Sequence, residues 1–288
     1  MRIGLLVSGN LGFICTQELL KLFDVTAVLT DKGSPSIVEL CKHHATPVFA
    51  GNPRGGAGVM YLRDNKVDFD LMISINYLFI VDPDLIAYPS VAAINFHGSL
   101  LPRYRGRTPH VWAIINNEEL TGITAHFIVP ECDAGAVIDQ MIVPIAKTDT
   151  GARLLGRFNQ LYPQFVKNVI VRFLSGAVEG VEQDHIKATY YGKRTPESGA
   201  ITWSWQKERI YNWVRAQAYP YPGAFCFYRE LKIIIDEVAF SDRGYNFAEP
   251  DGLVLSGGPT PIVKCPNGAL SIVRMRNTIE LKKGEILS

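Results

Sequence analysis

The chain has 288 residues, of which 29 are Lys or Arg and 28 are Asp or Glu, giving a formal net charge of +1 at pH 7. That length is enough to bury a sizeable core and favours two compact domains over one. The nearly neutral balance weighs against broad electrostatic binding of nucleic acid, although a net charge does not reveal a local basic patch.

Cysteine usage and the N-terminus indicate the cellular setting. The five cysteines, at positions 15, 41, 132, 226 and 265, are scattered, odd in number and without a C-x-x-C pair. A disulfide framework or a metal site is therefore not expected, and a reducing cytoplasm fits. The apolar run Ile3–Val7 is far too short to cross a membrane. We expect a cytoplasmic protein with no signal peptide, no metal and no membrane contact.

The first half of the chain alternates apolar runs with amphipathic segments. Strands are predicted over residues 3–7, 25–30, 48–50, 69–75 and 91–97, and helices between them over 13–22, 35–44 and 84–88. Residues 8–12 are expected to form the turn that leads into the first helix. This alternation predicts an α/β domain with a doubly wound, mostly parallel sheet, whose ligands bind beyond the carboxyl ends of the strands.

Polar side chains gather where one of these strands ends. Asn95 and His97 follow the apolar run Val91–Ile94, and residues two apart on a strand project from the same face. A loop bracketed by Pro102 and Gly106 comes next. Further along, the turn-like segment 129–135 supplies Asp133.

These three side chains suit acyl transfer to an amine. An amide and an imidazole can stabilise the oxyanion that forms when a nucleophile attacks a carbonyl, and an imidazole held by a carboxylate can carry protons near neutral pH. In the alternative interpretation, Asn95 caps a turn, His97 bonds to backbone and Asp133 is solvated. Residue types and spacing leave both interpretations open.

The stretch Asn95-Phe96-His97-Gly98-Ser99-Leu100-Leu101-Pro102, with Asp133 downstream, resembles the signature of the 10-formyltetrahydrofolate-dependent formyltransferases. The resemblance implies that N10-formyltetrahydrofolate is the formyl donor and that Asn95, His97 and Asp133 are catalytic. It implies further cofactor contacts from Asp133 and from the backbone of Leu78, Phe79 and Ile80, for which core packing is the alternative. Substrate contacts are implied at Asn10 and Ser99.

The loop after the signature carries cationic and aromatic side chains. Arg103 and Arg105 could grip a phosphate through paired hydrogen bonds, and Tyr104 could stack on a substrate or bind it through its hydroxyl. The alternative for both arginines is ordinary solvation. His126 lies in the predicted strand 122–129, where it could sit near Asn95, His97 and Asp133 or simply pack in the sheet, and we favour packing.

The second half of the chain has a different character. Residues 188–199 are polar and turn-rich, and beyond them follow a helix over 207–216 and short strands over 232–239, 252–255, 262–265 and 270–275. We predict a catalytic domain over 1–190, a linker over 191–200 and a small β-barrel-like (OB-like) domain over 201–288. The second domain resembles the carboxy-terminal domain of the same formyltransferases. Trp203, Trp205 and Trp213 could form a dimer face, but core packing is favoured for each.

Three features separate the branches of the resembled family. Residues 197–288 carry eleven Lys or Arg against ten Asp or Glu, whereas a tRNA-holding domain is more often visibly basic. Residues 106–113, Gly-Arg-Thr-Pro-His-Val-Trp-Ala, look like the sugar branch, where the tRNA branch has a Gly-Ala-Ala-Pro type of continuation. Residues 193–197, Lys-Arg-Thr-Pro-Glu, also look sugar-like.

The sequence therefore predicts transfer of a formyl group to the amine of a nucleotide-linked amino sugar. One example is a dTDP-4-amino-4,6-dideoxyhexose destined for cell-surface polysaccharide such as lipopolysaccharide O-antigen. The alternatives are a methionyl-tRNA formyltransferase and, in another class, a catalytically silent folate-binding or assembly module. The resemblance also implies a homodimer.

Overall fold

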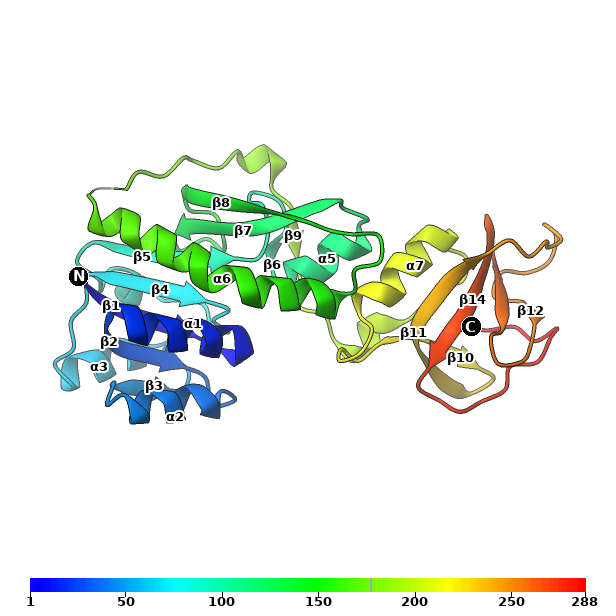
Figure 1. Cartoon of the computed structure of the whole chain (residues 1–288), viewed down its shortest axis with the longest axis horizontal. Coiled ribbons are helices and arrows are strands. Elements are labelled where there is room, and N and C mark those ends of the chain that lie inside the picture. Colours follow the sequence, from blue (N-terminus) through cyan, green and yellow to red (C-terminus); the bar gives the residue numbers. More distant parts are fainter. Residues whose placement is uncertain (177) are drawn as a thin grey trace. The chain divides into compact units, whose positions relative to one another are not determined.

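A computed structural model of the chain describes residues 1–176 and 178–288 (Figure 1). The chain divides into two compact units, which are described separately. Unit 1 contains residues 1–106, 121–143 and 157–191, and unit 2 contains residues 107–120, 144–156 and 192–288. The domain boundaries expected from the sequence stay a prediction.

Unit 1 is built on a seven-stranded sheet with the order β3-β2-β1-β4-β5-β7-β8. The strands are β1 (Arg2–Val7), β2 (Asp24–Thr30), β3 (Val48–Ala50), β4 (Leu71–Ile75), β5 (Ala92–His97), β7 (Leu120–Phe127) and β8 (Val137–Pro144). Pairing is parallel from β3 through β5 and becomes antiparallel between β5 and β7. The predicted doubly wound, mostly parallel sheet is therefore confirmed.

Helices cover both faces of this sheet (Figure 1). They are α1 (Gly9–Leu22), α2 (Pro35–His43), α3 (Ala57–Asp64), α4 (Pro83–Ile86) and α6 (Gly151–Leu174). On one face, Met72 and Ala93 of the sheet share a buried cluster with Leu62 of α3. On the other, Phe96 of β5 meets Phe165 of α6 edge to face at 5.8 Å. Both faces of the strands are apolar because both are covered.

The first helix begins earlier than the sequence suggested. Helix α1 starts at Gly9, immediately after the extended residue Ser8, so residues 9–12 form its first turn and the expected loop over 8–12 is wrong. Gly12 permits this entry, because a Cβ at that position would lie 3.1 Å from the Val7 side chain. Asn10 is consequently an exposed residue of a helical first turn.

Unit 2 contains a five-stranded antiparallel sheet with the order β10-β11-β14-β13-β12. These strands are β10 (Ala224–Tyr228), β11 (Leu231–Ser241), β12 (Val254–Ser256), β13 (Ile262–Cys265) and β14 (Gly268–Met275), and the helices of the unit are α5 (Pro109–Ile115) and α7 (Lys207–Ala216). Short segments complete the chain: β6 (Arg105–Gly106), β9 (Tyr190–Tyr191) and the 3₁₀ turns η1 (His185–Lys187) and η2 (Pro196–Gly199).

The last residues of the chain link the two edges of this sheet. Ser288 and Phe227 of β10 exchange two backbone hydrogen bonds, of 2.6 and 2.9 Å. Leu287 donates its N–H to the carbonyl of Gly252, just before β12, at 2.9 Å. Because the C-terminal segment pairs with both edges, the sheet closes on itself as a small barrel, and the barrel-like prediction is confirmed.

The aromatic residues of unit 2 fill and flank the barrel core. Trp203 is only 4% exposed and lies in the core, while Trp205 and Trp213 pack against it and meet each other at 5.0 Å. This is the core packing favoured for all three. Among the described residues, no helix is both long and apolar enough to cross a bilayer.

The closing segment supplies a stability prediction. Leu287 is 2% exposed, whereas its neighbour Ile286 is 52% exposed. We expect Leu287→Ala to lower the free energy of unfolding by about 2–5 kcal/mol, because a buried leucine is replaced by a cavity. Ile286→Ala is the matched control and should cost well under ~1 kcal/mol.

Urea unfolding followed by tryptophan fluorescence measures this effect, because all four tryptophans, at positions 112, 203, 205 and 213, belong to unit 2. Equal midpoints for the two variants would show that the C-terminal segment does not anchor the barrel.

Candidate active site

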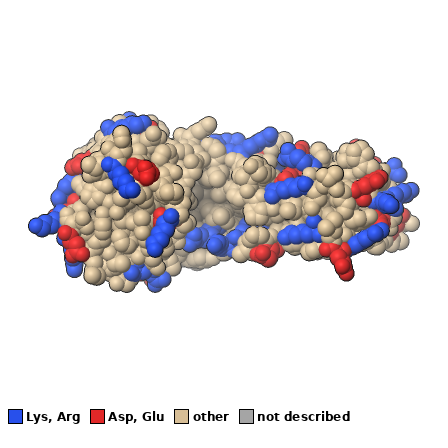
Figure 2. Space-filling view, turned by 90° about the horizontal axis from the view of Figure 1, so that it is seen from below, with Lys and Arg blue, Asp and Glu red and all other residues tan. Residues whose placement is uncertain are grey.

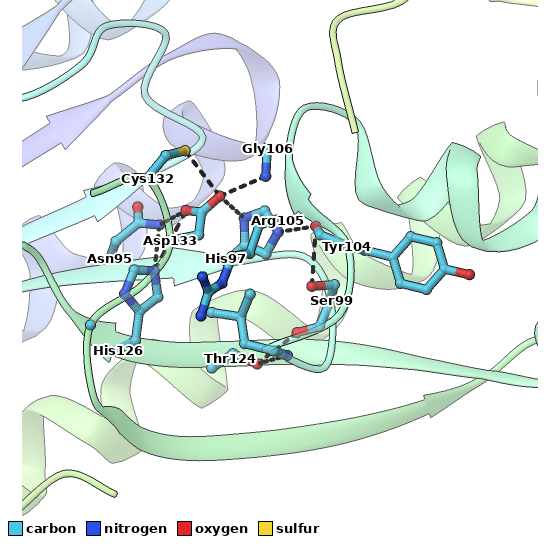
Figure 3. A network of polar contacts seen from close by, with 12 residues as sticks. Asn95, His97, Ser99, Tyr104, Arg105, Gly106, Thr124, His126, Cys132 and Asp133 are labelled. Carbon is cyan, nitrogen blue, oxygen red and sulfur yellow. Dashed lines mark hydrogen bonds and ion pairs between the residues drawn. The ribbon is translucent and has the colours of Figure 1, made fainter. Parts of the chain in front are cut away.

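Asn95 and His97 end strand β5 and project from the same face of the sheet (Figure 3). This is the end of the parallel strands at which α/β folds bind ligands. Asp133 reaches the same point from the turn between β7 and β8. The structure thus brings together the three side chains that the sequence singled out, all within unit 1.

The hydrogen bonds of the His97 ring determine which nitrogen carries its proton. Nε2 lies 2.7 Å from the backbone oxygen of Tyr104, and a carbonyl only accepts, so Nε2 must donate. Nδ1 lies 3.5 Å from Oδ2 of Asp133. Nδ1 is therefore the ring nitrogen that can gain or lose a proton, and it does so beside a carboxylate.

Asp133 lies in a cluster of polar groups. Its Oδ2 accepts the N–H of Gly106 at 2.8 Å, and its Oδ1 lies 3.5 Å from the Asn95 amide and 3.7 Å from His126 Nε2. Burial alone would raise the pKa of the Asp133 carboxyl. The charge of His97, the adjacent His126 ring and the Gly106 N–H outweigh burial, and the pKa lies below its ordinary value. Asp133 is therefore ionised at neutral pH.

His126 is packed in the sheet, as favoured from the sequence, with 2% of its surface exposed. It also belongs to this cluster, which is the alternative that the sequence left open. Its Nδ1 faces the Phe127 carbonyl at 2.9 Å, so in the neutral ring Nε2 is left to accept a hydrogen bond from the Asn95 amide at 3.1 Å. The contact arises because Asn95 pairs with His126 in the antiparallel register of β5 and β7. The sequence carried no signal for that register.

The loop from Ser99 to Gly106 is held by its own polar groups. Ser99 is fully buried and donates its hydroxyl to the carbonyl of Arg103 at 2.7 Å. Thr124 of β7 donates to the Ser99 carbonyl at 2.6 Å and accepts the N–H of Leu101 at 3.2 Å. These contacts give Ser99 a structural use in the loop, and its contact with substrate stays a prediction.

The three loop residues proposed to contact substrate occupy different environments. Arg103 is exposed, while Tyr104 is buried and stacks on Tyr191 with ring centroids 5.0 Å apart. Arg105 is 0% exposed, and its guanidinium donates to Gln183 at 2.6 Å and to the Tyr190 hydroxyl at 2.5 Å. Phosphate contact stays a prediction for the two arginines and substrate contact for Tyr104, and the guanidinium of Arg105 already has protein partners.

The segment after β4 lies at the same edge of the sheet. Leu78 is 44% exposed and Ile80 is 64% exposed, so core packing does not account for either side chain. Phe79 meets Tyr77 edge to face at 5.5 Å. The sheet order changes direction between β1 and β4, where doubly wound folds bind ligands, and Asn10 follows β1 there. Cofactor contact at 78–80 and substrate contact at Asn10 stay predictions.

Among the described residues, no cluster of three His, Cys, Asp or Glu side chains is arranged to hold a metal ion. The site can bind an anion or a carbonyl oxygen through Asn95 and can exchange a proton at His97. Those are the capabilities that acyl transfer to an amine requires.

The depressed pKa of Asp133 predicts a pH dependence of stability. Because the folded-state pKa lies below the unfolded value near 4, ionised Asp133 contributes stability that is fully present above about pH 4 and is lost as the pH falls below it. Asp133→Asn should therefore lower the free energy of unfolding by roughly 1–3 kcal/mol at pH 7.

The gap between parent and variant should narrow towards pH 3, which urea unfolding across this pH range measures. A gap that stays constant from pH 7 to pH 3 would contradict the assignment of a stabilised carboxylate.

Comparison with known proteins matches this chain to one family and to several solved structures of the same fold. WlaRD, a sugar 3N-formyl transferase crystallised in the presence of dTDP and 5-N-formyl-THF, has a TM-score of 0.74 and 18% identity, covering 97% of this chain and 99% of its own. An N-formyltransferase from Helicobacter canadensis, in complex with folinic acid and dTDP-3-aminofucose, has a TM-score of 0.70 and 19% identity over 95% and 98% of the two chains.

A methionyl-tRNA formyltransferase from Clostridium thermocellum has a TM-score of 0.59 and 14% identity over 84% of this chain and 94% of its own. These likenesses show a common fold. Residues 41–170 match the formyl transferase family, and residues 193–283 match the formyl transferase C-terminal domain. Both parts of the family's architecture are thus present in order, and the chain belongs to the formyl transferase family.

Proposed function

We propose that the chain transfers a formyl group from N10-formyltetrahydrofolate to the amine of a nucleotide-linked amino sugar. The observation that carries the proposal is the convergence of Asn95, His97 and Asp133 at the end of β5 in a formyl transferase. Two solved relatives that match nearly the whole chain are described with a formylated folate, one with dTDP and one with dTDP-3-aminofucose.

The proposed reaction exchanges one carbon–nitrogen bond for another. The neutral sugar amine attacks the formyl carbon, the bond from that carbon to N10 of the folate breaks, and one proton moves from the amine to N10. In this chain Nδ1 of His97 is the proton acceptor, because Nε2 is occupied by the Tyr104 carbonyl at 2.7 Å. Asp133, at 3.5 Å, stabilises the imidazolium that results.

Asn95 is assigned to the oxyanion of the tetrahedral intermediate. One amide N–H is held by His126 at 3.1 Å, which fixes the plane of the amide. Among the residues that the structure describes, the other makes just the 3.5 Å contact with Asp133, so a developing oxyanion can replace that contact at little cost. His126 therefore orients the donor, and Asp133 leaves the second N–H available.

We assign the folate and the nucleotide sugar to different segments at the carboxyl end of the parallel strands. We place the pterin of the folate against the backbone of residues 78–80, where the exposed Leu78 and Ile80 offer apolar cover. Among the two loop arginines, exposed Arg103 is the better candidate for the sugar's diphosphate. The guanidinium of Arg105 is used inside the protein, by Gln183 and Tyr190.

The choice of a sugar over tRNA is supported within unit 2. The two sugar-like segments contact each other, because the Arg194 guanidinium lies 4.9 Å from the Trp112 ring centroid and 4.4 Å from that of Trp213. Trp112 also donates its indole N–H to the Gly192 carbonyl at 3.2 Å. On the face shown in Figure 2, Lys and Arg are scattered with Asp and Glu among them.

Other features of the prediction rest on the sequence. Homodimerisation, a cytoplasmic location and a role in cell-surface polysaccharide such as O-antigen stay predictions. Methionyl-tRNA remains the alternative acceptor that the assay below distinguishes, and the absence of turnover with every acceptor would favour a silent folate-binding module.

An assay of tetrahydrofolate release from N10-formyltetrahydrofolate tests the proposal. The acceptors are dTDP-, UDP- and GDP-linked amino sugars, with methionyl-tRNA in parallel. We expect turnover with at least one nucleotide sugar and none with the tRNA. Asn95→Ala should lower kcat by about a hundredfold to a thousandfold, as removal of an oxyanion donor does.

Asn168→Ala is the control, because Asn168 is exposed on α6 and its side chain accepts a hydrogen bond from Gln164, one helical turn earlier. Turnover with the tRNA alone would overturn the acceptor class. Near-parental kcat in Asn95→Ala would overturn the role of the amide.

A further inference from the structure

We propose that Gln183 is a positioning residue for the reaction: one buried amide that locks the Asp133 turn to the loop carrying Tyr104 and Gly106. The inference deepens the proposed function and rests on it for its kinetic consequences. Gln183 lies in the stretch 171–192, outside both ranges that match the family, and is 6% exposed.

The Gln183 side chain is fully used by contacts to two separate segments. Its Nε2 donates to the carbonyl of Asp133 at 2.8 Å and to that of Gly135 at 2.7 Å. Its Oε1 accepts from Arg105 Nη2 at 2.6 Å and from Nε at 3.2 Å. One amide therefore bridges the turn that supplies the carboxylate and the loop that follows the catalytic histidine.

Arg105 is the other half of the bridge. It is completely buried, and its remaining guanidinium contacts are the Tyr190 hydroxyl at 2.5 Å and His185 Nδ1 at 3.3 Å. A buried guanidinium needs acceptors, and each of these comes from the segment 183–190. Arg105 thus holds the loop to that segment from inside.

Backbone contacts align the same two segments. Thr189 accepts the Arg105 N–H through its carbonyl and the Tyr104 N–H through its hydroxyl, both at 2.8 Å. Next to it, β6 and β9 pair in parallel. The segment 183–191 therefore runs along the catalytic loop, and within it Gln183 is the residue whose side chain extends to the Asp133 turn.

The contact between Gln183 and Arg105 holds the two segments that orient the His97 ring. His97 Nε2 bonds to the Tyr104 carbonyl, and Asp133 bonds to the Gly106 N–H, so the residues on both sides of Arg105 contact the site. Tyr104 and Asp133 both have positive φ angles, +63° and +52°. Residues with a side chain adopt this conformation less readily than glycine does, so contacts with other segments help to hold them there.

Two substitutions at Gln183 separate the role of its N–H donors from the role of its oxygen acceptor. Gln183→Ala removes all four contacts. Gln183→Glu keeps an acceptor for Arg105 but replaces the N–H donors with an oxygen facing two carbonyls. Gln164→Ala is the control, because Gln164 is an exposed glutamine of α6 whose amide bonds to Asn168.

Kinetics with N10-formyltetrahydrofolate and the most active nucleotide sugar test the positioning role at pH 8. Both Gln183 variants should lose about tenfold to a hundredfold in kcat, since a misplacement near 1 Å costs that much, while KM for each substrate changes less than threefold. Gln183→Glu keeps an acceptor for the buried Arg105 guanidinium, so its melting temperature should fall less than that of Gln183→Ala. Parental kcat in Gln183→Glu would overturn the proposal.

A second readout needs no acceptor and so separates this inference from the proposed function. Cys132 is exposed, and its thiol donates to Asp133 Oδ2 at 3.4 Å. The other four cysteines lie in the described part of the chain and are buried. The reaction rate of Cys132 with the disulfide reagent DTNB therefore reports on the Asp133 turn.

We expect the rate of Cys132 to change at least threefold in both Gln183 variants and to match the parent in Gln164→Ala. Unchanged Cys132 reactivity in Gln183→Glu would show that the turn does not depend on this amide, whatever the acceptor proves to be.

Discussion

A carboxylate that is largely shielded from water must be hydrogen-bonded or paired, and at Asp133, whose side chain is 11% exposed, that requirement organises the site. Two imidazole nitrogens lie beside it, at 3.5 Å and 3.7 Å, and its strongest hydrogen bond comes from the Gly106 N–H at 2.8 Å. Each partner comes from a different element: His97 from β5, His126 from β7 and Gly106 from the loop. Holding one charge in place therefore fixes the relative positions of three segments.

The same arrangement divides the chemistry between the residues. The Tyr104 carbonyl occupies one nitrogen of His97, which leaves the other nitrogen beside the carboxylate as the site of proton exchange. His126 occupies one N–H of Asn95 and leaves the other for an oxyanion. The His97 ring and the Asn95 amide could each have several hydrogen-bond partners, but these contacts leave each with one atom available for the reaction. Such preorganisation of polar groups is what acyl transfer depends on.

The sequence predicted the parts of the structure that depend on local pattern. The strand ending in Asn95 and His97, the parallel sheet and the short strands of the barrel all follow from side-chain periodicity and turn residues. His126 could not be placed, because its contact with Asn95 depends on the antiparallel register of β5 and β7, which no local pattern specifies. Gln183 and the buried state of Arg105 depend on contacts between segments about 80 residues apart in the chain. The start of α1 was missed because glycine and asparagine commonly mark turns.

The most direct test of this account is the protonation state of the His97 ring, measured by ¹⁵N NMR and assigned by comparison with His97→Gln. We predict that the neutral ring carries its proton on Nε2, bonded to the Tyr104 carbonyl, and leaves Nδ1 beside Asp133 as the basic nitrogen. A neutral ring protonated at Nδ1, with a lone pair on Nε2, would contradict it. The proton acceptor would then have to be another group, and the division of roles among Asn95, His97 and Asp133 would fail.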